Sequence, residues 1–324
     1  MPTSRRIQIG VRFFGGLRAS RPTSVFRIGG ELMSIDSLQE KIRKTKNPSV
    51  LELNMPVSDL PPHILEGEDT PAAAVARVCR ELMEQLRGIV PAVRVSFASF
   101  ALLGHDGLYQ LSQTLKRAGE LGYYVVLDAP EVLSPAMAKN AAQSLMGKDS
   151  IYPCDGLVVS GYLGSDVIKA FLPYCKAEKK DLFVVTRTAN KSAPEIQDLL
   201  AGSRVVHAAA ADHVNRYGAD TAGKFGYTQV GILAAASASD SLRSLRGKYP
   251  RLFLLLDGYD YPNANAKNCS YAFDKFGHGA AACGGAGITC AWKDAESDGQ
   301  DYLEHAKAAA ERMKKNLTRY VTVL

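Results

Sequence analysis

The stretch YYVVLD at residues 123–128 shows the pattern that decides the fold. Five consecutive aromatic or aliphatic side chains are followed by a single aspartate. A run of this kind is typical of a parallel strand buried on both faces, because strands with one face in water alternate between polar and apolar residues. A helical pattern follows at 135–146, so this part of the chain is predicted to form one strand and one helix.

The same strand-and-helix unit recurs on both sides of this stretch. Further strands are predicted at residues 49–54, 92–97, 156–160, 181–186, 229–233, 252–256 and 287–292. Helical patterns are predicted at 71–86, 105–120, 165–176, 192–201, 203–216, from about 239, at 263–276 and at 298–318. Eight such units predict an α/β protein, a closed (β/α)8 TIM barrel in a single domain. An open doubly wound sheet is the alternative, but no Gly-x-Gly-x-x-Gly follows the first strand.

The charge of the chain is distributed unevenly. The 324 residues include 39 Lys and Arg against 33 Asp and Glu, a formal charge of +6. Residues 1–32 hold six arginines and one acidic residue, and without them 33 basic residues face 32 acidic ones. We interpret 1–32 as a basic N-terminal extension that results from a start codon assigned too early, with a targeting segment or a functional basic arm as alternatives. Residues 33–324 are predicted to form the barrel, which is close to neutral, so no nucleic-acid partner is expected.

Other classes of function are disfavoured by patterns that the sequence lacks. No run of about 18 apolar residues is present, which excludes a membrane-spanning helix. The six cysteines form no C-x-x-C pair and the histidines form no H-E-x-x-H, so neither a metal site nor a cofactor is expected. Free thiols are typical of a reducing compartment, and we expect a cytoplasmic protein.

The site is expected where the barrel strands end, since the chemistry of TIM barrels takes place at the C-terminal edge of the strands. The polar residues at these ends are Glu52, Asn54, Arg94, Ser96, Asp128, Ser160, Tyr162, Arg187, Asn190, Asp257, Tyr259 and Lys293. A few polar groups of mixed charge are what a small-molecule pocket needs. The alternative for each residue is a solvated position in a loop.

Two of these strand ends carry motifs that resemble the long bacterial type of orotidine 5′-phosphate decarboxylase, a dimeric (β/α)8 enzyme of pyrimidine biosynthesis. VSGYLG at 159–164 is similar to Val-Asn-Pro-Tyr-Leu-Gly in that family, and TRTAN at 186–190 to Val-Arg-Thr-Ser-Asn. DGY at 257–259 stands where the family has Pro-Gly-Tyr or Pro-Gly-Val, and the likeness runs from about Val50 to Trp292. The resemblance implies a homodimer with a pocket near its interface and a small-molecule ligand, phosphorylated in the family. The ligand-binding candidates are Asn54, Ser160, Tyr162, Arg187, Thr188, Asn190, Asp257, Gly258, Tyr259 and Lys293.

The catalytic motif departs from the family pattern. The family's third strand carries Asp-x-Lys-x-x-Asp, whose lysine protonates the carbanion left by decarboxylation, whereas DAPEVL at 128–133 keeps only Asp128. Pro130 replaces the lysine and Leu133 the second carboxylate, and a proline has no proton to donate. Arg94 stands where the family has a lysine on the second strand, and Asn54 where it has an aspartate on the first. Asp128 and Arg94 are therefore the remaining catalytic candidates.

The phosphate-binding residues of the family are also replaced. A glutamine after the seventh strand and an arginine after the eighth hold the phosphate in the family, but here the first loop reads GYDYP (258–262) and only Lys293 lies near the second position. Asp257 and Asp260 would repel a phosphate unless each is paired. Either the ligand is not a nucleotide monophosphate, or Lys293 and Arg187 have taken over its recognition.

Three hypotheses follow for the function. The first is a relative of orotidine 5′-phosphate decarboxylase that is catalytically impaired or repurposed, since loss of a general acid typically costs about 10²–10⁴-fold in rate. The second is an active decarboxylase with an unusual proton donor. The third is a non-enzymatic, dimeric structural or interaction protein.

Overall fold

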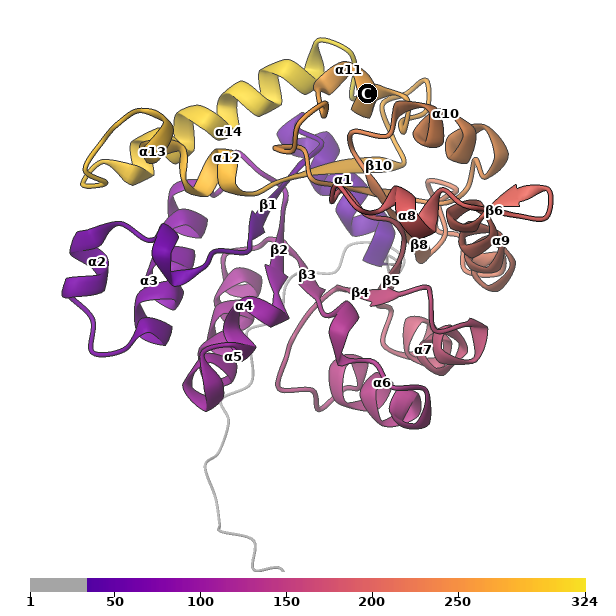
Figure 1. Cartoon of the computed structure of the whole chain (residues 1–324), viewed down its shortest axis with the longest axis horizontal. Coiled ribbons are helices and arrows are strands. Elements are labelled where there is room, and N and C mark those ends of the chain that lie inside the picture. The colour runs from indigo at the N-terminus through magenta and orange to yellow at the C-terminus, as the bar shows by residue number, and fades with distance from the viewer. Residues whose placement is uncertain (1–33) are drawn as a thin grey trace, which may run out of the picture. The chain divides into compact units, whose positions relative to one another are not determined.

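A computed structural model describes residues 34–324, so the interpretation of residues 1–32 lies outside the described part of the chain. Eight parallel strands close into a barrel in the order β1-β10-β9-β8-β5-β4-β3-β2 (Figure 1). These strands are β1 Ser49–Leu53, β2 Ala92–Ser96, β3 Tyr124–Asp128, β4 Gly156–Ser160, β5 Asp181–Arg187, β8 Val230–Ala235, β9 Leu254–Asp257 and β10 Ala280–Gly284. The prediction of a (β/α)8 TIM barrel is confirmed.

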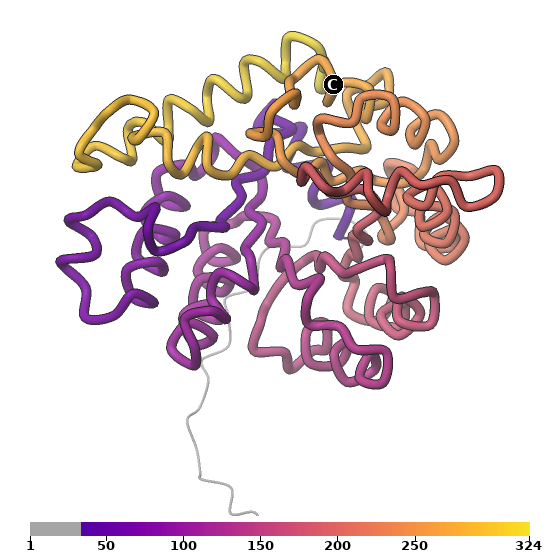
Figure 2. Tube along the Cα trace, in the orientation of Figure 1, coloured from indigo at the N-terminus to yellow at the C-terminus, as the bar shows by residue number. Residues whose placement is uncertain are grey.

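Helices surround the strands as an outer layer (Figure 2). They are α1 Ser34–Thr45, α2 Pro62–Glu66, α3 Pro71–Gln85, α4 Phe97–Ala101, α5 Gly104–Glu120, α6 Ala138–Met146, α7 Ser165–Ala177, α8 Pro194–Gln197, α9 Val206–Gly218, α10 Ser239–Lys248, α11 Ala266–Ser270, α12 Ala286–Thr289, α13 Ala291–Asp294 and α14 Tyr302–Thr318. Among the helices of residues 34–324, none is both long and apolar enough to cross a membrane.

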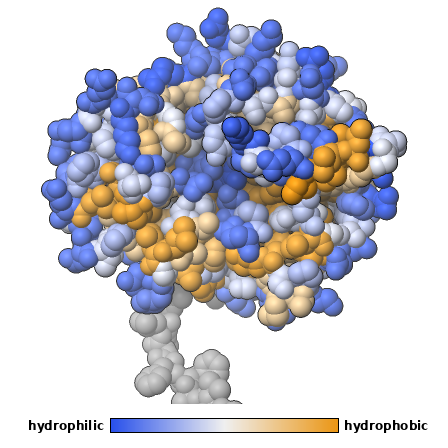
Figure 3. Space-filling model, in the orientation of Figure 1, coloured by the Kyte–Doolittle hydropathy of each residue, from blue (hydrophilic) through white to orange (hydrophobic). Residues whose placement is uncertain are grey.

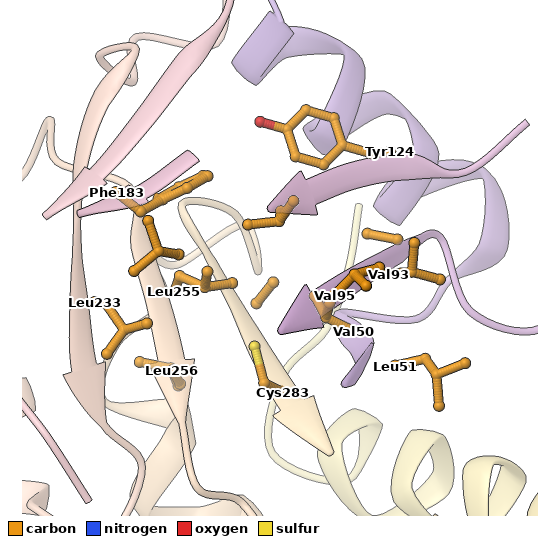
Figure 4. Packing of buried hydrophobic residues seen from close by; sticks show 14 of the residues in the cluster. Val50, Leu51, Val93, Val95, Tyr124, Phe183, Leu233, Leu255, Leu256 and Cys283 are labelled. Atoms are coloured by element: carbon orange, nitrogen blue, oxygen red, sulfur yellow. The ribbon is translucent and has the colours of Figure 1, made fainter. Parts of the chain in front are cut away.

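The barrel core is formed by the apolar runs that predicted the strands. Every residue of β2, β3, β5, β8 and β10 is buried, as expected for strands that are covered on both faces. Figure 4 shows side chains from different strands, such as Val95, Phe183, Leu255 and Cys283, converging in this core. On the surface drawn in Figure 3, the centre is mainly hydrophilic and apolar side chains gather nearer the periphery.

Helix α1 covers the N-terminal end of the barrel and leaves the opposite end for a site. Ser34 Oγ donates to the carbonyl of Asp155, just before β4, at 3.1 Å. Gln39 Oε1 accepts from the amide of Gly279, just before β10, at 3.0 Å. The buried carboxylate of Asp36 accepts from two consecutive amides of the loop that precedes β8. These contacts place α1 against the starts of strands from both halves of the barrel.

The eighth strand lies elsewhere than predicted. The sequence favoured residues 287–292, but the strand is β10, Ala280–Gly284, and the predicted segment forms α12 and α13. The β-branched and aromatic side chains of that segment, Ile288, Thr289 and Trp292, are buried at a helical spacing instead. β10 is made of small residues, and a Cβ on Gly284 would lie 2.7 Å from Sδ of Met313 in α14. Packing of α14 against this strand therefore overrides its weak β propensity.

Two predicted helices are also shorter than expected. Of residues 192–201, only α8 is helical, and β6 (Leu200–Ala201) pairs antiparallel with β7 (Arg204–Val205). Gly202 has φ +67° in the connecting turn, a conformation that favours a hairpin over a helix. In the predicted helix 263–276, only α11 forms. Its start is set by the Asn265 side chain, which caps the helix by accepting from the amide of Asn268.

Candidate ligand pocket at the strand ends

Arg94 lies at the centre of the polar residues at the strand ends. Its side chain is 7% exposed and donates to Asp128 Oδ2 through Nη2 at 2.7 Å and to Asp257 Oδ1 through Nη1 at 2.6 Å. Oε1 of Glu52 lies 3.6 Å from Nη1. The register of β1 and β2 places Glu52 opposite Arg94, so the three carboxylates come from three different strands. We call these four residues the Arg94 cluster.

The Arg94 cluster has one cation for three carboxyl groups. Burial opposes the charge of Arg94, but Asp128, Glu52 and Asp257 outweigh it and raise the pKa of Arg94 well above its ordinary value. Burial raises the pKa of Glu52 to about 7, against the opposing effect of Arg94 and with a further contribution from the neighbouring carboxylates. The pKa of Asp128 is also raised by burial, opposed by Arg94. Arg94 therefore holds its proton, and Glu52 is the group that exchanges one near neutral pH.

Two atoms of the cluster remain without a partner. Nε of Arg94 and Oδ1 of Asp128 are buried and make no hydrogen bond within residues 34–324. Buried polar atoms are nearly always satisfied by protein, water or ligand. These two atoms give the cluster an unused donor and an unused acceptor.

Two cavities open at the strand ends and share Tyr261. The smaller, of about 130 Å³, is lined by Glu52, Asn54, Asp257, Gly258, Asp260, Tyr261, Gly285 and Ala286. The larger, of about 680 Å³, is lined by Arg187, Ala189, Asn190, Lys191, Pro194, Ser237, Ala238, Tyr261, Pro262 and Asn263. The first is acidic and includes Glu52 and Asp257 of the Arg94 cluster, whereas the second is lined by two cations and two side-chain amides. Together they offer a small molecule both acceptors and donors.

The predicted ligand-binding residues in the loop after β5 form most of their hydrogen bonds with one another and with the nearby residues Gln197 and Asp198. Arg187 makes two hydrogen bonds to the carboxylate of Asp198, at 2.9 and 3.0 Å, and is itself buried. Thr188 Oγ1 donates to Asn190 Oδ1 at 2.6 Å, and the Thr188 amide donates to Gln197 Oε1 at 2.7 Å. Of these, Arg187 and Asn190 line the larger cavity. The Asp198 carboxylate neutralises the Arg187 cation there.

The loop after β4 is organised by Ser160 and Tyr162. Oγ of Ser160 accepts from the Tyr162 amide at 3.3 Å, and the Tyr162 hydroxyl donates to the carbonyl of Thr186 in β5. Burial raises the pKa of Tyr162 to about 12. These two residues shape the rim of the barrel by holding the β4 loop to β5.

Tyr259 and Lys293 make contacts directed elsewhere. Burial raises the pKa of Tyr259 to about 12, and the Asn316 side chain of α14 opposes this rise. Nζ of Lys293 donates to Asp59 Oδ1 at 2.8 Å and to the Ser58 carbonyl at 3.2 Å, in the loop after β1. Lys293 also lies within α13, the second of two short helices that follow β10, and not at a strand end as predicted. The inference that Lys293 could hold a ligand phosphate rested on that misplaced strand.

The neighbours of Asn54 and Gly258 explain why these two residues line the acidic cavity. Asn54 Oδ1 accepts from Oγ of Ser99 at 2.6 Å, which fixes the amide at the cavity edge. Gly258 has φ +69°, and a Cβ there would lie 2.3 Å from the ring of Tyr261 and 2.4 Å from Cβ of Ala189. Only glycine allows the loop after β9 to approach the loop after β5 this closely.

The segment expected to carry the catalytic lysine contains no lysine. Pro130 begins a short 3-10 helix, Pro130–Val132, and Leu133 packs against the hydrophobic core. Within residues 34–324, no lysine forms an ion pair or hydrogen bond with the Arg94 cluster. The same part of the chain contains no group of three or more His, Cys, Asp or Glu placed to hold a metal ion.

The sequence did not reveal how Glu52 and Asp260 are used. Glu52 stands at a strand end, but its place in the Arg94 cluster depends on the β1–β2 register. Asp260 Oδ2 accepts from the Gly285 amide at 2.5 Å, immediately after β10. With the eighth strand misplaced, nothing in the sequence placed Gly285 beside the β9 loop.

Known proteins resemble this chain over most of its length, although no family model matches it. An orotidine 5′-phosphate decarboxylase of Rhodopirellula baltica is 26% identical over 293 residues, covering 86% of this chain and 97% of that protein. One of Clostridium novyi is 24% identical over 289 residues, covering 89% and 99%. A solved Streptomyces avermitilis structure described as an orotidine 5′-phosphate decarboxylase has a TM-score of 0.75 and 21% identity, covering 92% and 99%. The similarity to solved structures supports the barrel fold. The similarity to these sequences supports the resemblance to orotidine 5′-phosphate decarboxylases that the strand-end motifs indicated.

Proposed function

Because the chain resembles orotidine 5′-phosphate decarboxylases over most of its length, we propose that it is a member of their family whose decarboxylase machinery is impaired or repurposed. In this proposal the strand-end cavities bind a small molecule through Asn54, Arg187, Asn190, Asp257 and Gly258. The observation that carries the proposal is the Arg94 cluster: its only cation is bound to Asp128 and Asp257, and Pro130 stands where the resemblance places the catalytic lysine.

The family reaction converts orotidine 5′-phosphate to uridine 5′-phosphate and CO₂, and it needs a proton for the carbon that loses CO₂. Arg94 cannot supply this proton, since its neighbours raise its pKa well above the ordinary value. Pro130 has no proton on its side chain or its backbone nitrogen. The electrostatic array that should stabilise the transition state is therefore missing its donor, and preorganised arrays of this kind contribute much of an enzyme's rate.

Turnover of orotidine 5′-phosphate tests this proposal directly. We expect the purified protein to convert it at least about 10²–10⁴-fold more slowly than the Rhodopirellula relative measured in parallel, since this is the usual loss when a general acid is removed. A cooperative unfolding transition of the same sample serves as the control for folding. Comparable turnover by the two proteins, or normal growth without uracil of a decarboxylase-deficient strain that expresses this chain, contradicts the proposal.

One observation favours a second candidate, an active decarboxylase with an unusual donor. Glu52 lines the acidic cavity and has a pKa of about 7, so near neutral pH it holds a proton that it can release. General acids work best when their pKa lies near the working pH. If the wild type shows slow turnover, Glu52→Gln should abolish it under this candidate and leave it unchanged under the first.

The quaternary structure and location belong to the same proposal. A homodimer follows from the family resemblance, and multi-angle light scattering of the purified chain would test it by mass. The cytoplasmic location rests on the unpaired cysteines of the described residues, all six of which are buried free thiols.

A further inference from the structure

The loop after β9 places a carboxylate of the chain itself on the backbone that follows β10. Oδ2 of Asp260 accepts from the Gly285 amide at 2.5 Å, and the Gly287 amide is close enough to oppose the rise that burial causes in the pKa of this carboxylate. A Cβ on Gly287 would lie 2.5 Å from Oδ1 of Asp260, so any other residue there would push the carboxylate away. The glycines and the aspartate therefore form one fitted unit.

This position is where an anion is expected in such a barrel. TIM barrels frequently hold a phosphate group with the loops that follow their seventh and eighth strands. β9 and β10 are the seventh and eighth strands of this barrel in chain order. Backbone amides that converge on one point form a concavity that binds anions. In this chain the concavity is already filled by Asp260.

The surrounding charges oppose a phosphate as well. Lys293 is paired with Asp59, and Arg187 with Asp198, so a carboxylate of the chain neutralises each of these two cations. Glu52 and Asp257 line the same cavity as Asp260. A phosphate that entered would replace one carboxylate and meet two others, without a free cation from these residues to balance its charge.

We infer that Asp260 is a specificity-determining residue that occupies the anion position of the pocket and restricts it to ligands without a phosphate group. Such a ligand would present hydrogen-bond donors or a positive charge to Glu52, Asp257 and Asp260. The inference rests on the proposed function, because it names the ligand class for the same strand-end pocket.

Inorganic phosphate is the probe that tests this inference, with amide chemical shifts of Gly285 and Gly287 as the readout. In the wild type we expect no saturable shift of these two amides. In Asp260→Ala the amides lose their carboxylate, and we expect saturable shifts together with a tenfold or greater gain in the affinity for uridine 5′-phosphate relative to uridine. Asp260→Asn retains an oxygen that can accept from the Gly285 amide, so phosphate should still be excluded from this position.

Asp294→Ala is the matched control, since Asp294 is a nearby carboxylate that acts on Asp260 only through its charge. It should leave the two amides insensitive to phosphate. Saturable shifts in the wild type, their absence in a folded Asp260→Ala, or an equal gain in Asp294→Ala would each overturn the inference. This readout needs no turnover: decarboxylation by the wild type would contradict the proposed function, whereas phosphate binding at the wild-type amides would contradict the role of Asp260.

Discussion

The Arg94 cluster makes a prediction about stability that can be worked out from its geometry. Arg94→Met keeps an unbranched side chain of similar length but removes the cation that Asp128 and Asp257 share. Removing one partner of a buried ion pair costs about 3–5 kcal/mol, because the remaining charge is left buried without compensation. For a domain of this size class each kcal/mol lowers Tm by roughly 2–4 °C, so we expect a fall of roughly 6–20 °C at pH 8.

The loss should be smaller in acid. Burial already raises the pKa of Asp128, and Arg94 is the main group that opposes this rise. Without Arg94 the carboxyl groups of the cluster keep their protons to higher pH, and a protonated carboxyl costs far less to bury than a charged one. The destabilisation by Arg94→Met should therefore be large at pH 8 and clearly reduced at pH 5.

Urea unfolding of both proteins at the two pH values measures this difference. Arg117→Met is the matched control: Arg117 pairs with Glu84 and Glu120, but its side chain is 40% exposed, and water and salt screen exposed pairs so that they contribute little to stability. The reasoning is refuted if Arg94→Met is no less stable than Arg117→Met at pH 8, or if its loss is the same at pH 5.

Three further predictions concern other sites. Because the pKa of Glu52 is raised to about 7, the stability that its protonated form contributes is complete below pH 4.5 and is lost as pH rises through about 7. In urea unfolding, Glu52→Gln should therefore flatten the dependence of the unfolding free energy on pH over this range and raise that free energy by up to about 3 kcal/mol at pH 8. Burial raises the pKa of Asp181 well above its usual range, and Tyr124 donates to its Oδ2; Asp181→Asn should be at least as stable as wild type at pH 8, whereas Asp181→Leu should lose about 1–3 kcal/mol because the Tyr124 hydroxyl loses its acceptor. Gly258→Ala should lower Tm more than Gly88→Ala, since both glycines have positive φ but only at Gly258 would the added Cβ clash; equal losses would mean that the backbone conformation alone sets the cost.

The strands could be predicted where burial leaves a mark on the sequence. A run such as 123–128 must be apolar throughout because both faces of β3 are covered, and this constraint is visible in one segment. β10 leaves no such mark, since its small residues Ala280–Gly284 are selected by the close approach of α14. Because the small residues of β10 reflect the helix that packs on it, the strand cannot be identified from its own sequence.

The sequence could predict where the site lies, but not which charged residues form ion pairs there. Parallel strands end at one rim, so the sequence placed Arg94, Asp128 and Asp257 together, and they are in contact. It could not show that Lys293 pairs with Asp59, because these residues meet only when the loops after β1 and β10 fold against each other. Ion pairs between distant segments are decided by tertiary structure.

These pairings have a common consequence for the ligand. Four of the groups that could bind an anion at the strand ends hold a carboxylate of the chain: Arg94 holds Asp128 and Asp257, Arg187 holds Asp198, Lys293 holds Asp59, and the Gly285 amide holds Asp260. An anionic ligand that bound to any of these four groups would have to displace the carboxylate and leave it without its partner, at a cost of about 1–3 kcal/mol or more. A ligand that donates hydrogen bonds meets the oxygens of Glu52, Asp257 and Asp260 without breaking any pair. The three carboxylates of the acidic cavity therefore favour ligands that donate hydrogen bonds, in agreement with the role inferred for Asp260.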